Sequence, residues 1–170
     1  TAMYRALLMN LEGWVKGTAT PLDSRYPSVT DGTLAVATPN PASTGRPDLA
    51  AAGLRYNGAY NTLSVNDESV SPPVAGDRYY VVPQPTTDAQ GNERAGVKMP
   101  DIAVPLATFT GYNLRKPGYV EGQQNGLNSS QLAFATTPST RKPGDPRKNV
   151  QELYGSKAAY VDAVNRAVDQ

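Results

Sequence analysis

The positions of proline and glycine constrain this 170-residue chain more than any other feature. All 15 prolines lie between Pro21 and Pro146, and 13 of the 15 glycines lie between Gly17 and Gly144. Proline interrupts helices and central strands, and glycine weakens both. The middle of the chain is therefore predicted to be extended and rich in turns, and helices are expected only at the two ends.

Both ends carry apolar residues at helical spacing. Between Ala2 and Lys16 the apolar stripe consists of Met3, Leu7, Leu11 and Trp14, widened by Leu8 and Val15, and Gly17 is placed to end the helix. At the other end, Ser156 is placed as an N-cap before an apolar face of Tyr160, Val161, Val164 and Val168. The spacing predicts two amphipathic helices, and each needs a surface to pack on.

The middle offers a few short strand candidates. Residues 78–82 and 94–99 flank a turn-rich stretch at 88–92, which predicts a hairpin over 78–99 whose first strand Pro83 and Pro85 confine to an edge. Residues 101–110 are the most apolar middle segment, and Pro105 argues against a central strand there. Residues 37–75 have the composition of an arm laid over a larger body.

The supply of core residues is low. Leu, Val, Ile and Phe make up 31 of 170 residues, or 18%, below the roughly 20% that folded domains usually exceed. The net charge of +1 does not fit a disordered chain. We therefore expect a chain that folds but depends on packing against another polypeptide or domain for its stability.

Two absences remove whole classes of chemistry. The chain has no Cys, which excludes disulfides, thiolate metal sites and a Cys nucleophile, and no His, which excludes a Ser-His-Asp triad and His-ligated metals. No cofactor and no metal site are expected. The balanced charge predicts no nucleic-acid partner, and no apolar stretch approaches a membrane span. Because the chain opens on Thr1, we expect a processed or internal start; the compartment stays open, with secretion or a periplasmic location compatible.

Three local patterns have a chemical interpretation and a simpler one. Thr1 can be a terminal nucleophile or a helix cap. Asp88, Asn92 and Glu93 around Gly91 loosely resemble a calcium loop, and an ordinary Asp/Gly turn is the favoured interpretation. A short basic cluster, here favoured as a solvated loop over a phosphate site, consists of Arg141, Lys142, Arg147 and Lys148.

Residues 91–115, GNERAGVKMPDIAVPLATFTGYNLR, resemble a segment near the C-terminus of a family of large bacterial alpha/beta hydrolase domain proteins. Other pieces are similar to that family in the same order: Arg5-Ala6-Leu7-Leu8 to Trp14-Val15, Ser24-Arg25-Tyr26-Pro27, Asp31-Gly32-Thr33-Leu34, Gly144-Asp145-Pro146-Arg147, Tyr154-Gly155-Ser156 and Tyr160-Val161. The resemblance covers essentially the whole chain.

The resemblance implies a region downstream of the catalytic His, because the chain has no G-x-S-x-G elbow and no His. It implies an α+β fold with much irregular structure that forms part of a larger α/β-hydrolase fold. Residues 1–17 are then the closing helix of the hydrolase core, 18–146 a Pro/Gly-rich extension and 147–170 the C-terminal helix. The partner is the catalytic core, in the same precursor or on a separate chain.

The resemblance carries over no catalytic residue. It implies only that one stretch lies at the rim of a hydrolase pocket, with candidates Asp101, Gly111, Tyr112, Asn113 and Arg115. Two functions are therefore compatible with the chain. One is the non-catalytic C-terminal portion of a serine hydrolase acting on an ester, lactone or related acyl substrate, and the other is a stand-alone binding or structural subunit.

Overall fold

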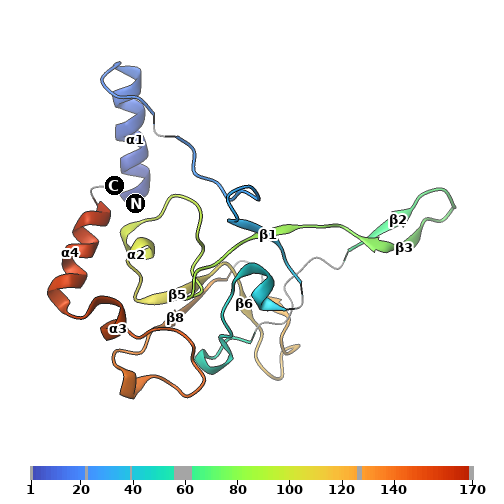
Figure 1. The fold of residues 1–170 in the computed structure, drawn as a ribbon. Coiled ribbons are helices and arrows are strands. Elements are labelled where there is room, and N and C mark those ends of the chain that lie inside the picture. Colours follow the sequence, from blue (N-terminus) through green and yellow to red (C-terminus); the bar gives the residue numbers. More distant parts are fainter. Residues whose placement is uncertain (1, 22, 39, 56–62, 126–127, 169–170) are drawn as a thin grey trace.

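The computed structural model describes residues 2–21, 23–38, 40–55, 63–125 and 128–168. They form an α+β arrangement of helices and short antiparallel strands joined by long irregular segments (Figure 1). The helices are α1 (Ala2–Val15), α2 (Pro100–Ala103), α3 (Val150–Tyr154) and α4 (Lys157–Val168), with single 3-10 turns at Pro41–Thr44, Ala50–Ala52 and Pro138–Thr140. The strands are β1 (Leu34–Val36), β2 (Ser64–Asp67), β3 (Val74–Tyr79), β4 (Pro83–Pro85), β5 (Ala107–Thr110), β6 (Asn113–Leu114), β7 (Gln124–Asn125) and β8 (Ser130–Ala133).

The strands pair only in twos. Within the described ranges, the antiparallel pairs are β1 with β4, β2 with β3, β5 with β8, and β6 with β7. In the pair β5 and β8, Thr108 lies opposite Leu132 and Thr110 opposite Ser130. A two-stranded ribbon buries little by itself. What surrounds these ribbons therefore decides whether they are stable.

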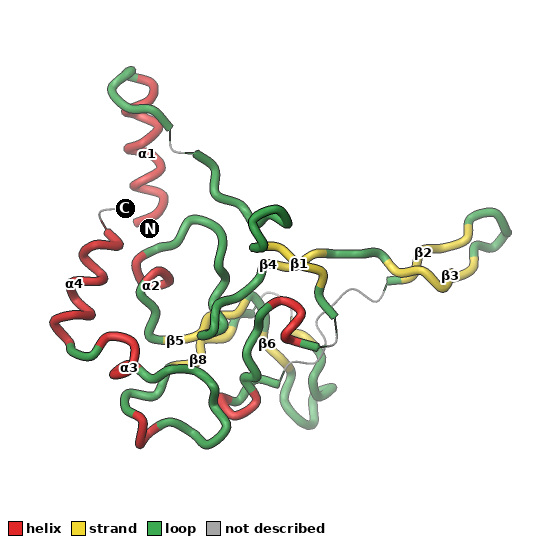
Figure 2. The backbone as a smooth tube through the Cα atoms, in the orientation of Figure 1, coloured by secondary structure: helices red, strands yellow, loops and turns green. Residues whose placement is uncertain are grey.

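The N-terminal helix is confirmed, and its apolar stripe is uncovered. α1 ends at Val15, and Gly17 then takes a φ of +69°, which glycine adopts without strain. Leu7 is 52% exposed and Trp14 57% exposed. α1 stands away from the rest of the structure (Figures 1 and 2). The helix forms from its sequence pattern, and its apolar face meets no equivalent face within the described residues.

The C-terminal region contains a helix that the sequence pattern predicted and one that it did not. The Ser156 hydroxyl accepts a hydrogen bond from the Ala159 N–H at 3.1 Å, which confirms Ser156 as the N-cap of α4. The additional helix α3 begins with a capping box, in which Asn149 accepts from the Glu152 N–H and Glu152 accepts from the Asn149 N–H. α4 packs against α2 and α3.

The predicted strand pairing over 78–99 is wrong. Residues 78–82 and 94–99 do not pair with each other: β3 pairs with β2, which forms a hairpin that projects from the body (Figures 1 and 2), and β4 pairs with β1. The chain does reverse at 88–92, where Thr87 bridges to Glu93 and the Asp88 N–H donates to the Asn92 carbonyl at 2.8 Å. The prolines of β4 lack ladder donors and Gly96 has a φ of +91°, so neither side continues as a strand.

The buried residues are mostly polar. The buried apolar side chains in the described ranges are Ala37, Leu49, Leu54, Val104, Ala107 and Phe134. The buried polar ones are Thr44, Thr86, Thr87, Gln90, Asn92, Thr108, Thr110, Ser130, Arg147 and Asn149. Hydrogen bonds therefore stabilise the centre of this structure. In a larger domain, an apolar core has that role.

Candidate functional sites

A buried network of hydrogen bonds centres on Arg147, which is 3% exposed. Its guanidinium donates to both Asp145 carboxylate oxygens, at 2.9 Å from Nε and 2.8 Å from Nη2. Nη1 donates to the Thr108 hydroxyl at 2.9 Å and to the Leu132 carbonyl at 2.8 Å, and Nη2 donates to the Ala133 carbonyl at 3.4 Å. All five N–H groups of the side chain therefore have partners inside the protein.

Two amide side chains extend this network to the neighbouring loops. The Asn92 side chain donates to the Ala107 carbonyl at 3.1 Å and accepts from the Phe109 N–H at 2.8 Å, so it satisfies the side of β5 away from β8. Gln90 makes the same pair of bonds with the backbone of Lys148, both at 3.0 Å. The network joins the 88–92 turn, β5, β8 and the segment before α3.

The electrostatics of the network indicate a structural role. Hydrogen bonds from the Arg147 side chain hold the pKa of the Asp145 carboxyl below its usual value, with burial opposing them. The Phe134 ring lies under the guanidinium, 5.3 Å from its centroid. Because every donor of Arg147 is engaged, this cation has no capacity left for a ligand.

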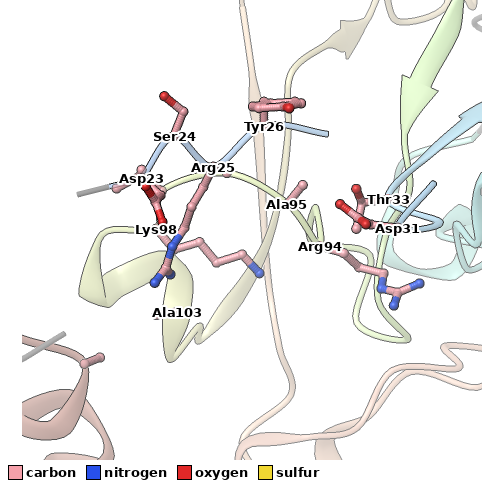
Figure 3. Close-up of a pocket in the computed structure, with 13 residues that line it drawn as sticks. Asp23, Ser24, Arg25, Tyr26, Asp31, Thr33, Arg94, Ala95, Lys98 and Ala103 are labelled. Carbon is pink, nitrogen blue, oxygen red and sulfur yellow. The ribbon is translucent and has the colours of Figure 1, made fainter. Parts of the chain in front are cut away.

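A second charged cluster lines an open groove (Figure 3). The groove has a volume of about 650 Å³ and lies between residues 23–33, which follow α1, and residues 94–98, which precede α2. Its charged lining residues are Asp23, Arg25, Asp31, Arg94 and Lys98. In Figure 3, Asp23, Arg25 and Lys98 lie toward one end, and Asp31 and Arg94 lie toward the other.

The cations of this groove are not neutralised. None of Arg25, Arg94 and Lys98 forms an ion pair with another described residue, and none of their side chains donates a hydrogen bond to one. In contrast, Arg147 is paired with Asp145 and Arg141 with Glu152. The groove is thus the place in the described structure where several charged side chains face one hollow with their hydrogen-bonding capacity free.

A smaller hollow of about 420 Å³ lies beside α3 and α4. Leu106, Val150, Tyr154 and Tyr160 supply its apolar lining. The Tyr154 hydroxyl donates to the Pro105 carbonyl at 2.7 Å, and burial raises its pKa. This hollow offers apolar surface and little polar chemistry.

The five predicted rim residues line neither of these hollows. Asp101 lies on α2, Gly111 and Tyr112 lie between β5 and β6, and Asn113 begins β6, which Arg115 follows. The Tyr112 ring lies 5.2 Å from the Arg46 guanidinium, and burial raises the pKa of its hydroxyl. A place for these residues at a pocket of a complete hydrolase stays a prediction.

The structure gives a separate outcome for each of the three local patterns with a chemical interpretation. The basic cluster is divided, because Lys142 and Lys148 are exposed while Arg147 is buried in the network, so the solvated-loop interpretation was wrong for Arg147. At the loose calcium pattern, the Asp88 carboxylate accepts from the Gln90 and Asn92 N–H groups, both at 2.9 Å, as a turn residue does. Thr1 lies outside the described residues.

Comparison with known proteins identifies the family. A family model for the alpha/beta hydrolase domain matches residues 1–170, the whole chain. The chain belongs to the alpha/beta hydrolase domain family. No curated protein and no solved structure matches this alpha/beta hydrolase chain.

The structure adds two features of this alpha/beta hydrolase chain that residue patterns missed. The groove cations come from segments more than 60 positions apart, and no local pattern joins them. The burial of Arg147 has no local signal, because its partner Asp145 lies only two positions earlier and its other partners lie on distant strands. No helix in the described ranges has the length and hydropathy needed to cross a membrane.

Proposed function

We propose that the chain is the non-catalytic C-terminal portion of a serine hydrolase acting on esters, lactones or related acyl substrates. Its Ser-acid-His triad then lies on residues outside these 170. The observation that carries the proposal is a hydrolase-family chain without a single His. The triad needs an imidazole to take the proton from the Ser hydroxyl, and this sequence has no substitute for it at a G-x-S-x-G elbow.

The exposed surface supports dependence on a larger body. The chain exposes 11,954 Å², whereas a folded monomer of 18.1 kDa is expected to expose roughly 8,000 Å². The difference is large compared with ordinary interfaces, which bury about 1,600 Å² in total. A surface of this size is typical of a piece that is covered by another part of the protein.

The exposed stripe of α1 supports docking on the hydrolase core. In α/β folds, helices lay their apolar stripe on a mostly parallel sheet. The described residues contain only antiparallel pairs of strands, so that sheet is not among them. We therefore assign the stripe of Met3, Leu7, Leu11 and Trp14 to the hydrolase core sheet.

A stand-alone binding or structural subunit is the alternative. The charged groove favours it, because a ligand can bind there without any triad. The two functions differ in whether a larger polypeptide with acyl-hydrolase activity accompanies the chain.

Hydrolysis of p-nitrophenyl acetate tests the proposal. The 170-residue chain alone should show no turnover, and the purified protein with its accompanying polypeptide should hydrolyse the ester. A serine-directed fluorophosphonate should then label residues outside the 170. Labelling within the 170 residues, or turnover by the chain alone that a Thr1→Ala change abolishes, would overturn the proposal.

A further inference from the structure

The groove of Figure 3 has the dimensions of a small-molecule site. Its volume of about 650 Å³ lies within the roughly 300–1,000 Å³ of typical ligand pockets. Its walls come from two segments distant in the sequence, and Ala103 of α2 and Ala167 of α4 add small apolar side chains to the lining. Small side chains at these positions leave the space free for a ligand.

The charges of the groove specify the kind of ligand. Three cations and two carboxylates give it a net charge of +1 (Arg25, Arg94 and Lys98 against Asp23 and Asp31). A ligand with a single negative charge balances this lining. A dianion would leave a net negative charge in the groove, close to the Asp23 carboxylate. Arg25 and Lys98 lie toward the same end of the groove (Figure 3), and a guanidinium binds a carboxylate through two parallel hydrogen bonds.

The other end of the groove offers both an acceptor and donors. The Asp31 carboxylate accepts hydrogen bonds and the Arg94 guanidinium donates them, and neither side chain is engaged with a described residue. A hydroxyl group both donates and accepts, so it satisfies the two together. Tyr26 adds an exposed ring to the lining.

We propose that this groove binds a small hydroxylated carboxylate, whose carboxylate pairs with Arg25 and Lys98 and whose hydroxyls reach Asp31 and Arg94. The site does not depend on where the hydrolase triad lies. It requires only the geometry of residues 23–33 and 94–98.

Calorimetric titration of the purified protein, together with any larger polypeptide that accompanies it, tests the site with gluconate as the probe. Sorbitol is the matched neutral probe, because it has a hydroxymethyl group in place of the carboxylate. Gluconate should bind and sorbitol should not. Lys98→Gln should weaken the Kd for gluconate about tenfold, the effect of losing one charge-assisted hydrogen bond, and Arg25→Gln should weaken it at least as much, because the guanidinium supplies two such bonds.

Two further variants separate local from general charge effects. Lys142→Gln removes the same charge from an exposed loop outside the groove, and should leave the Kd unchanged. Asp23→Asn removes a repulsive carboxylate and should tighten the Kd severalfold. Each variant should keep the melting temperature of the parent protein, since none of the substituted residues is buried.

Several results would overturn the assignment. Equal binding of sorbitol and gluconate would show that the groove does not recognise a carboxylate. Inorganic phosphate that binds the same residues more tightly than gluconate would make the ligand a phosphate. A Kd that Lys98→Gln and Lys142→Gln change alike would reduce the effect to net charge. Gluconate binding to the 170-residue chain that disappears in the assembly would assign the groove to an acidic side chain of the larger polypeptide. Aryl acetate hydrolysis, measured in parallel, reports on the proposed function separately.

Discussion

Arg147 uses all five of its N–H groups inside the protein, and three of its partners belong to the β5 and β8 pair. The Asp145 carboxylate beside it has a side chain only 7% exposed. A buried ion pair contributes little net free energy compared with an apolar pair of the same size. Removing one partner is costly, however, because the other charge stays buried without compensation.

Replacing Arg147 by Met should therefore destabilise the protein strongly. We expect Arg147→Met to lower the free energy of unfolding by about 3–5 kcal/mol, the cost of leaving a buried charge unpaired. Lys148→Met, at the adjacent exposed residue, is the matched control and should change the free energy by less than about 0.5 kcal/mol. Urea unfolding curves measure both. Similar curves for the two variants would contradict the structural role of Arg147.

The lowered pKa of Asp145 predicts how the free energy of unfolding changes at low pH. Hydrogen bonds from Arg147 lower the pKa of this carboxyl in the folded state. The unfolded chain therefore takes up a proton at Asp145 at a higher pH, near the usual value of about 3.9, than the folded chain does. The contribution of Asp145 is complete above that pH and is lost as the pH falls through the lowered folded value.

The matching measurement compares urea unfolding at pH 7 and at several values between pH 5 and 2. Asp145→Asn should be less stable than the parent protein at pH 7, and its stability should fall less steeply as the solution is acidified. A variant with the parent's slope would show that Asp145 does not carry this part of the acid sensitivity.

At the scale of elements, the short strands depend on side chains for the partners that a larger sheet provides. Asn92 bonds to Ala107 and Phe109 on the side of β5 away from β8. Arg147 bonds to the Leu132 and Ala133 carbonyls of β8. Asn92 takes the place of a neighbouring strand for two backbone groups of β5, and Arg147 adds donors to two carbonyls of β8. These bonds explain how a two-stranded ribbon persists in a structure with little apolar core.

The proposed docking of the α1 stripe on the hydrolase core predicts that substitutions in the stripe destabilise the assembly. Leu7→Glu, at the centre of the apolar stripe, should lower the free energy of unfolding of the assembly by about 2–4 kcal/mol, as loss of a buried leucine does. Met9→Glu, on the polar side of the same helix and 72% exposed, should change it by less than about 0.5 kcal/mol. Thermal unfolding of the assembly compares them. Equal effects would show that the stripe of α1 has no partner.

At the scale of the whole molecule, the exposed surface predicts how the chain behaves alone. The 18.1 kDa chain should be recovered with a larger polypeptide in native mass spectrometry, or joined to one. Alone, it should bind a dye that reports exposed apolar surface, and the dye signal should fall in the assembly. A monomer at 18.1 kDa that unfolds cooperatively and binds no dye would contradict dependence on a larger body, and would favour the stand-alone subunit.

The features that the sequence predicted correctly are local. The spacing of Met3, Leu7 and Leu11 predicted α1, and the Ser156 cap with its apolar face predicted α4, because a helix is decided by residues three and four positions apart. The prolines and glycines likewise limited the middle to short elements. The expectation of helices only at the two ends was wrong for α2, because Pro100 stands at the start of that helix, where proline is tolerated. The absence of His excluded the triad from these residues.

Only the tertiary structure decided the strand partners and the fate of the charged residues. The pairing expected over 78–99 was replaced by pairing with β1 and β2, segments that local patterns did not identify. Arg147 meets Thr108 across 39 positions, and Gln90 meets Lys148 across 58. Contacts over such separations depend on the path of the whole backbone, which no local spacing encodes. For the same reason, Arg147 is buried although the sequence predicted a solvated loop for it. Arg25 and Lys98, which are distant in the sequence, line the same groove.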